Sequence, residues 1–471
     1  MFNLIIHFIT SFAIGFYLIT VLQWYNYKVN RIIFHFHRIR WHIFYLLIPL
    51  ITYIFAAKFF WIYFIFGYIP ALIIWFRRIK KPLNVTKRVK RFFLILGFVE
   101  TINLVFMNKI HYNPGIALFV VLILTVFSAE MIEYIMFLKY KSMAKKRLKE
   151  INPQIITITA SYGKTSIKNF VYEILKDKFK TYKTPRSVNT IKGIVLDINT
   201  KLSEDTDIYI TEAGARQKND IEEIVKFLEN EYSILGKIGP QHIEYFKTLE
   251  NIKKTKLEIF DTPKLKKGFS YELPYNEKVE VIKEKISNIK ATLNGTEWDL
   301  EIKGQNHHFQ TNILGGFNAI NISLAIYQAL EFIKDIEYIK QAVLKLPYIP
   351  HRLQKIEVGG KIIIDDSFNG NIDGMSESFE IIKEYSGRKV IVTPGLVEAN
   401  EELNEKIAKK IDNIFDLAII TGKINKDILC KNIINIDKVY LADKSKLEKM
   451  LSDLTKAGDL IIFSNDAPEY L

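Results

Sequence analysis

The chain has 471 residues, of which 49% are hydrophobic and 13% aromatic, and a formal net charge of +14. This apolar content excludes a disordered or collagen-like chain. The single cysteine excludes a disulfide framework and any cysteine-ligated zinc or iron–sulfur site. Residues 1–150 contain 20 basic and 4 acidic residues, and the rest of the chain has a net charge of −2. The basic residues lie in blocks between apolar runs, so we expect no nucleic-acid partner.

Five apolar segments lie in the first 140 residues. They cover residues 3–25, 42–57, 59–76, 92–107 and 114–138. Because about 20 apolar residues cross a bilayer as a helix, the pattern predicts a membrane domain of about five transmembrane helices over residues 1–140. Basic residues follow the first, third and fifth segments. The positive-inside rule then predicts a multi-pass protein of the bacterial inner membrane, with its N-terminus outside and its catalytic domains cytoplasmic.

A phosphate-binding loop is the first feature of the remaining chain. The β-branched run at residues 155–159 predicts a buried parallel strand, and residues 167–178 have a helical pattern. Between them lies A-S-Y-G-K-T-S, although Ile158 occupies the first glycine position of the full motif. The backbone N–H groups of such a turn bind phosphate oxygens. The predicted nucleotide-binding residues here are Ser161, Tyr162, Gly163, Lys164, Thr165 and Ser166.

A second strand, at residues 207–211, ends at Glu212. A carboxylate at the carboxyl end of a parallel strand lies beside the phosphate loop in such folds, where it can bind Mg²⁺. An ordinary solvated glutamate at a strand end is the alternative interpretation.

Alternating strand and helix patterns continue to the C-terminus. An insert of strands is expected around residues 262–312, with a turn at Asn294-Gly295, followed by a helix over residues 318–333. Five later segments predict a doubly wound, Rossmann-like sheet. We therefore predict a multi-domain α/β protein with a central ATP-binding domain at 141–335 and a C-terminal domain at 336–471. The five strands are expected at residues 361–364, 389–392, 417–420, 438–441 and 460–463.

From residue 150 to about residue 400 the chain resembles the ATP-dependent Mur ligases of peptidoglycan synthesis. Six stretches match motifs of that family in the same order, and the R-L-Q and D-D-S-F-N-G-N pair is the most characteristic. The resemblance implies the family's α/β fold, with the C-terminal domain closing over ATP. The stretches lie at residues 160–165, 211–215, 239–246, 249–259, 316–321 and 352–371.

The resemblance also implies catalytic and metal-binding roles. Lys164 would neutralise the γ-phosphate, and Thr165 and Glu212 would hold one Mg²⁺. His242 resembles a ligand of a second Mg²⁺, although it could also be a surface histidine. Lys256 matches a lysine that family members carbamoylate, which would make it both catalytic and metal-binding. A surface lysine on a helix is the alternative for Lys256.

Further residues match nucleotide and substrate contacts of the family. Asn318 and Asn321 would contact adenine, Arg352 the γ-phosphate and Asp366 the ribose region. The implied substrate-binding residues are Asn189, for which a plain turn residue is the alternative, and Asn369.

The resemblance is strongest to the member that adds D-alanyl-D-alanine to UDP-N-acetylmuramoyl-tripeptide through an acyl phosphate. It implies those substrates, ATP and one or two Mg²⁺ ions. With the predicted spans, it also implies a lipid bilayer and membrane peptidoglycan enzymes as partners. Two other functions stay open: a ligase or amidating subunit acting on a lipid-linked muropeptide, and a membrane transport or scaffold protein with a phosphate-loop module.

Three departures from the family bear on these expectations. Ala160 replaces a glycine of the phosphate loop, and Phe317 replaces a histidine near the adenine. The soluble N-terminal domain that holds the UDP-sugar in the family has no counterpart here. The last departure leaves the acceptor substrate open, whereas the ATP chemistry is unaffected.

Overall fold

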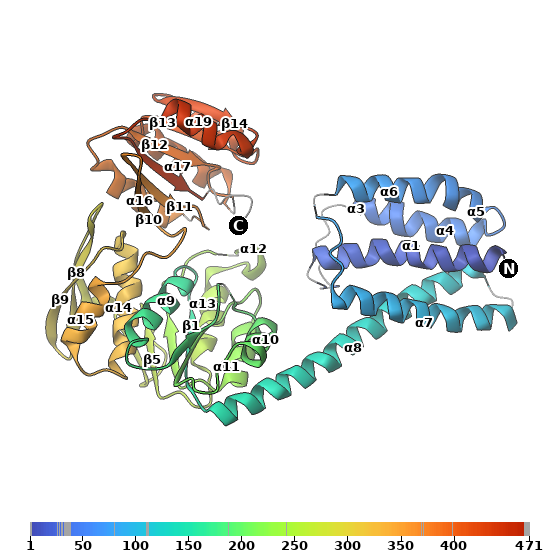
Figure 1. The fold of residues 1–471 in the computed structure, drawn as a ribbon, viewed down its shortest axis with the longest axis horizontal. Coiled ribbons are helices and arrows are strands. Elements are labelled where there is room, and N and C mark those ends of the chain that lie inside the picture. The colour runs from blue at the N-terminus through green and yellow to red at the C-terminus, as the bar shows by residue number, and fades with distance from the viewer. Residues whose placement is uncertain are drawn as a thin grey trace. The chain divides into compact units, whose positions relative to one another are not determined.

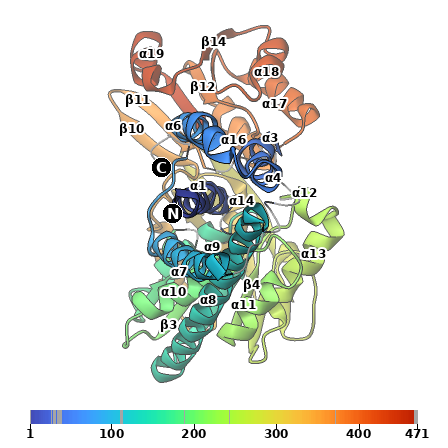
Figure 2. The same ribbon diagram turned by 90° about the vertical axis from the view of Figure 1, so that its right-hand side faces the viewer.

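The computed structural model describes residues 2–25, 27, 29, 32, 39–79, 81–109, 113–186, 188–241, 243–368, 370, 372–397 and 399–465. The chain divides into two compact units, Met1–Ser142 and Met143–Leu471. Figures 1 and 2 show that the first unit is helical and that the strands belong to the second.

The first unit is built from long apolar helices. Pro49 and Pro70 each lie in the first turn of a helical segment, where the missing N–H costs nothing. A short turn at residues 56–59 joins the helical runs at residues 39–55 and 60–78. The three long helices are α1 (Phe2–Trp24), α7 (Lys87–Lys109) and α8 (Pro114–Ile151). Two further runs each contain a short π-helix. The first run is α3 (Ile39–His42), the π-helix η1 (Ile43–Leu47) and α4 (Ile48–Phe55), and the second is α5 (Phe60–Tyr63), the π-helix η2 (Phe64–Tyr68) and α6 (Ile69–Arg78).

Three helices in the described part of the unit are long and apolar enough to cross a membrane, by length and composition alone. The run at residues 39–55 is shorter, and α7 carries charged side chains. Arg88 pairs with Glu130 of α8 at 2.6 Å, and the buried Glu100 accepts a hydrogen bond from Ser11 at 3.0 Å. The number of five spans therefore stays a prediction. Of the basic residues between the apolar segments, Lys28, Arg31, Arg38 and Lys80 lie outside the described residues.

The second unit opens with a six-stranded parallel sheet in the order β2-β3-β1-β4-β5-β6. β1 is central and almost wholly buried, as expected for a β-branched run covered on both faces. Both strands predicted beside the phosphate loop are confirmed as β1 and β3. The predicted insert is corrected, because β5 and β6 extend this sheet rather than leave it. The strands are β1 (Gln154–Thr159), β2 (Thr181–Lys183), β3 (Ile208–Glu212), β4 (Tyr232–Leu235), β5 (Lys267–Ser270) and β6 (Val279–Val281).

Helices and a small antiparallel sheet accompany the parallel sheet. Gly295, after the predicted turn, has φ +136°, and a Cβ there would lie 2.2 Å from the Thr311 carbonyl oxygen, so glycine is required. The small sheet comprises β7 (Ile286–Thr292), β8 (Gly295–Ile302) and β9 (Gln305–Thr311). The helices are α9 (Lys164–Leu175), α10 (Ile191–Thr200), α11 (Asp220–Leu228), α12 (Ile243–Phe246), α13 (Leu249–Leu257), η3 (Glu258–Phe260), η4 (Lys283–Lys285), α14 (Gly316–Leu330) and α15 (Ile336–Leu344).

A second six-stranded sheet has the order β10-β11-β15-β12-β13-β14. Only β10 is antiparallel to its neighbour, so the predicted doubly wound pattern and all five of its strands are confirmed. The strands are β10 (Gln354–Val358), β11 (Lys361–Asp366), β12 (Lys389–Thr393), β13 (Leu417–Thr421), β14 (Asp437–Leu441) and β15 (Leu460–Ser464). The helices are α16 (Ile372–Lys383), α17 (Glu401–Ile414), α18 (Lys426–Asn432), η5 (Lys444–Lys446) and α19 (Leu447–Leu454).

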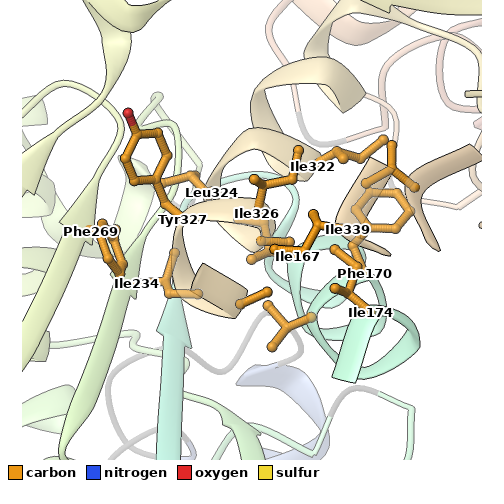
Figure 3. Packing of buried hydrophobic residues seen from close by; sticks show 14 of the residues in the cluster. Ile167, Phe170, Ile174, Ile234, Phe269, Ile322, Leu324, Ile326, Tyr327 and Ile339 are labelled. Atoms are coloured by element: carbon orange, nitrogen blue, oxygen red, sulfur yellow. The ribbon is translucent and has the colours of Figure 1, made fainter. Parts of the chain in front are cut away.

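The main core of the second unit packs α9 against α14 and the parallel sheet. Ile167, Phe170 and Ile174 repeat at helical spacing and form one buried stripe of α9. Figure 3 shows this stripe beside Ile322 and Ile326 of α14. Since α9 begins at the phosphate loop, this packing positions the loop.

We expect Phe170→Ala to destabilise the second unit by about 3–5 kcal/mol, because Phe170 is 1% exposed and its loss leaves a cavity between α9 and α14. Amide hydrogen exchange of β1 measures this loss. Leu196→Ala on α10, where the side chain is 61% exposed, is the control and should change the free energy of unfolding by less than about 0.5 kcal/mol. Unchanged exchange of β1 in Phe170→Ala would contradict the packing argument.

Candidate active site

The phosphate loop at residues 160–163 joins the carboxyl end of β1 to the first residue of α9. Gly163 precedes the helix with φ +84°, a left-handed conformation that favours glycine. A Cβ on Gly163 would lie 2.6 Å from Oδ1 of Asn321, so the α14 asparagine rests against the loop. Free N–H groups in the first turn of α9, together with the helix dipole, form an anion-binding site.

Lys164 folds back over the loop. Its Nζ donates hydrogen bonds to the carbonyl oxygens of Ala160 at 2.7 Å and Ser161 at 3.2 Å. Burial lowers the pKa of Lys164 to about 8; the Glu212 carboxylate opposes this shift and Arg352 adds to it. Lys164, with a pKa of about 8, therefore lies at the point where a phosphate group would bind.

Glu212 is fully buried at the end of β3, beside Ile158 of β1. Its Oε1 lies 2.8 Å from Nζ of Lys168, on the next turn of α9 after Lys164. Among the described residues no group donates a hydrogen bond to Oε2. The solvated-glutamate interpretation is excluded, and one carboxylate oxygen is left for a cation.

Lys256 of α13 is 4% exposed, which excludes the surface-lysine interpretation. Its Nζ lies 3.4 Å from Oγ1 of Thr159, the last residue of β1. Burial holds the pKa of Lys256 well below its ordinary value, and the positive charge of Lys164 lowers it further. The structure thus brings Lys164, Glu212 and Lys256 to the carboxyl ends of β1 and β3.

Asn318 and Asn321 lie on the buried face of α14. Asn318 donates from Nδ2 to the Leu314 carbonyl oxygen at 2.8 Å, and Asn321 donates to Oδ1 of Asn318 at 3.4 Å. At the start of this helix, the Phe317 N–H donates to Oε1 of Glu377 at 3.0 Å. Glu377 comes from α16, so a residue of the C-terminal sheet region caps the helix that carries both asparagines.

Arg352 and Asp366 come from the segment that joins the two sheets and from the end of β11. The Arg352 guanidinium lies 4.9 Å from the Phe368 ring centre. Burial lowers the pKa of Arg352, and the carboxylates of Glu212 and Asp366 raise it. Burial raises the pKa of Asp366 to about 6, while Arg352 and the Leu353 N–H, which donates to Oδ1 at 3.2 Å, oppose the shift. The charge of Arg352 therefore interacts with two carboxylates, Glu212 at the end of β3 and Asp366 at the end of β11.

The joining segment has an unusual backbone. His351 and Leu353, on either side of Arg352, have φ values of +62° and +52°. His351 is held by Asp365, whose Oδ2 lies 2.7 Å from Nδ1, and Ser367 donates to Oδ1 of Asp365 at 2.6 Å. These bonds stabilise left-handed conformations that non-glycine residues rarely adopt. They thereby fix the backbone position from which the Arg352 side chain extends.

The other predicted residues fall into three groups. Thr165 and Ser166 occupy the first turn of α9; Ser161 donates to the Gly239 carbonyl oxygen at 2.9 Å, and the Tyr162 ring packs on Gly239. Asn189 accepts a hydrogen bond from the Gly214 N–H at 2.8 Å, two residues after Glu212. His242 and Asn369 lie outside the described residues.

The donor set fits Mg²⁺, which prefers oxygen ligands from one or two carboxylates. The buried Oε2 of Glu212 has no donor, and Thr165 follows Lys164 in the same helical turn. Within the described ranges, no three His, Cys, Asp or Glu side chains gather into a preformed metal site. Among the described residues of the loop and β3, Glu212 and the Thr165 hydroxyl are therefore the oxygen ligands on offer to a cation.

Two residues of the site were missed by the sequence analysis. Lys168 lies four residues after Lys164 and so shares its helix face, which is a signal that could have identified it. Glu377 carries no such signal, because its contact with α14 joins segments 60 residues apart.

Comparison with known proteins agrees with this geometry. Residues 158–329 match the Mur ligase middle domain. The UDP-N-acetylmuramoyl-tripeptide–D-alanyl-D-alanine ligase of Buchnera aphidicola subsp. Baizongia pistaciae is 27% identical over 346 residues, which cover 66% of this chain and 73% of that enzyme. The Bacillus subtilis ligase of the same name is 24% identical, covering 69% and 75%. The crystal structure of the MurF ligase of Thermotoga maritima in complex with ADP has a TM-score of 0.60 at 22% identity, covering 70% and 80%.

The predicted localisation, multi-pass in a bacterial inner membrane, is wrong by these comparisons. The matched ligases are soluble cytoplasmic enzymes. The three long apolar helices of the first unit meet a criterion of length and composition alone. Part of their apolar surface is used within the unit, where Ile14 and Tyr17 of α1 are fully buried.

The match to the middle domain covers the phosphate loop, Glu212, Lys256 and both asparagines of α14. The second unit also has the fold of a solved MurF ligase. Over the residues of this core, the chain is therefore similar to the Mur ligases.

Proposed function

We propose that the chain is an ATP-dependent amide-bond ligase of peptidoglycan precursor synthesis, which adds D-alanyl-D-alanine to UDP-N-acetylmuramoyl-tripeptide. The observation that carries the proposal is the convergence of Lys164, Glu212 and Lys256 at the ends of β1 and β3, with Arg352 acting from the next sheet. The relatives reported above are ligases of this substrate pair by name. A transport or scaffold function has no comparable support.

The reaction needs an activated carboxylate, because a free carboxylate does not form an amide in water. An oxygen of the tripeptide carboxylate attacks the γ-phosphorus of ATP, the bond to the β-phosphate oxygen breaks, and ADP leaves. The amine nitrogen of D-alanyl-D-alanine attacks the carbonyl carbon of the acyl phosphate and loses a proton. The bond to phosphate then breaks, and inorganic phosphate is released.

The chain's own residues supply charge and position for both steps. Lys164 pairs with the γ-phosphate by leaving the loop carbonyls that it now contacts. Arg352 approaches the same charge from the segment between the sheets, as phosphoryl transfer requires of a second cation. Thr165 and Glu212 would hold Mg²⁺, which when bound neutralises charge on the β- and γ-phosphate oxygens. Asn318 and Asn321 offer amide groups to the adenine side of the site.

Lys256 fits the role of a carbamoylated residue. Because its pKa is held well below the ordinary value, its amine is uncharged enough to attack CO₂. The carbamate places a negative charge beside the Lys164 ammonium and offers oxygen atoms to a cation. An unmodified ammonium at this position would repel Mg²⁺.

The direct test supplies the full-length protein with ATP, Mg²⁺, UDP-N-acetylmuramoyl-tripeptide and D-alanyl-D-alanine. We expect phosphate release that depends on both substrates, and a product with the mass of the pentapeptide. Lys164→Ala should lower the rate by at least about 100-fold, because it removes a charge that stabilises the transition state. ATP binding without any pentapeptide would reject this acceptor pair.

Carbamoylation of Lys256 can be observed directly. Protein equilibrated with ¹³C-bicarbonate should give one protected carbamate carbon resonance, and the signal should be absent from Lys256→Met. Lys253→Met, a substitution three residues earlier on α13, should retain it and serves as the control. A spectrum that is the same for the wild type and Lys256→Met would refute the modification.

The pKa of Lys164 predicts how nucleotide affinity depends on pH. Its ammonium is the phosphate-binding form, and the lowered pKa of about 8 means that this form is lost as pH rises above 8. The association constant for a non-hydrolysable ATP analogue should therefore fall by up to about tenfold per pH unit between pH 8 and 9.5. Calorimetric titration measures this loss. Lys164→Arg should bind without that decline, and a flat wild-type profile would disprove the assignment.

A further inference from the structure

We propose that Lys168 is a positioning residue that joins the metal-binding carboxylate of Glu212 to the loop at residues 184–190. Metal binding and acceptor binding then depend on the same lysine side chain. The inference rests on the proposed function, in which Glu212 would hold Mg²⁺, and on the expectation from the sequence that Asn189 binds the acceptor substrate. No motif assigns a role to Lys168.

The Lys168 ammonium is 1% exposed and has three partners. Its Nζ lies 2.8 Å from Oε1 of Glu212 and donates to the carbonyl oxygens of Thr184 at 2.8 Å and Arg186 at 2.6 Å. A lysine ammonium has three N–H donors, so these three acceptors match its capacity. The group is thus fully satisfied although it is buried.

This arrangement gives the two carboxylate oxygens of Glu212 different surroundings. Lys168 lies against Oε1, whereas Oε2 has no donor among the described residues. Lys168 therefore places a positive charge beside Oε1 of this buried carboxylate before any metal arrives. It also fixes which oxygen faces the metal, as outer-shell partners of metal ligands do.

The two carbonyl contacts connect the same ammonium to the loop. Thr184 and Arg186 begin the segment that continues through Asn189 to Thr190, whose hydroxyl oxygen caps α10. At its far end the Asn189 carbonyl oxygen accepts the Gly214 N–H, two residues beyond Glu212. The loop is therefore tied to β3 and the residues after it by two main-chain hydrogen bonds and by Lys168. The second main-chain bond runs from the Thr184 N–H to the Ile210 carbonyl oxygen at 3.0 Å.

A second buried carboxylate, that of Asp197, also acts on Lys168. Asp197 of α10 accepts hydrogen bonds from Tyr182 at 2.8 Å and Tyr209 at 3.2 Å, and its charge acts on Lys168. Lys168 thus lies between two carboxylates, one at the site and one in the helix that follows the loop. A displacement of the loop would separate these charges, which couples its position to that of Glu212.

The test compares Lys168→Met with Lys176→Met, the same substitution at a solvated position just after α9. Calorimetry of a non-hydrolysable ATP analogue at increasing Mg²⁺ gives the Mg²⁺ concentration for half-saturation. For Lys168→Met we expect a rise of about 10- to 100-fold. The KM for the tripeptide substrate should also rise, and Lys176→Met should match the wild type in both measurements.

A double-mutant cycle identifies Glu212 as the partner through which Lys168 acts. Glu212→Gln should weaken Mg²⁺ dependence, and adding Lys168→Met should weaken it no further. Lys168→Gln, which keeps length and polarity without charge, repeats the test if Lys168→Met does not fold. Mg²⁺ dependence equal to the wild type, or additive effects in the cycle, would overturn the proposal. Binding of nucleotide and Mg²⁺ without pentapeptide synthesis would count against the proposed function alone.

Discussion

The site depends on how charge is compensated at the buried carboxyl ends of β1 and β3. Lys164 and Lys168 approach one carboxylate, Glu212, while Lys256 lies beside Thr159 and is affected by the charge of Lys164. Each lysine is accommodated differently. Lys168 has Glu212 and two carbonyl oxygens as partners, which oppose the lowering of its pKa by burial, whereas burial lowers the pKa of Lys164 to about 8 and holds that of Lys256 well below its ordinary value. The excess of positive charge prepares the region for a triphosphate and a carboxylate substrate.

The packing of α9 against α14 makes this arrangement rigid. Ile167, Phe170 and Ile174 attach the helix of the phosphate loop to the core, while Asn321 of α14 contacts Gly163 directly. The same helix pair therefore holds the phosphate loop and the buried asparagines of α14 at a fixed separation. Such preorganisation matters because phosphoryl transfer is catalysed mainly by positioning and charge.

The second sheet participates through a few side chains. Arg352 leaves the joining segment between two residues in left-handed conformations, and Glu377 caps α14 from α16. Lys237 and Asp373 add a contact of 3.5 Å across the same boundary. Leu314 and Phe317, at the start of α14, also pack in the core of the second sheet, so the boundary has apolar as well as polar contacts.

Much of the fold and part of the site could be predicted from the sequence because their signals are local. A β-branched run, a Gly-Lys-Thr turn and a helical stripe identified β1, the loop and α9, and the alternation of strand and helix identified the later parallel sheet. Local apolarity alone does not decide which of the five segments cross a membrane. The run at residues 39–55 is shorter than the three helices that meet the length criterion, and α7 carries buried and paired charges.

By itself, the sequence determined the order of the strands along the chain, the phosphate loop and the identity of the charged residues. Tertiary structure alone decided which of those charges meet. Lys168 and Glu212 are 44 residues apart in the chain, and Lys256 approaches Thr159 across 97 residues. Strand order and helix docking set such distances, and these depend on the whole core rather than on any short pattern. The burial that lowers the pKa of Lys164 and Lys256 follows from the same packing.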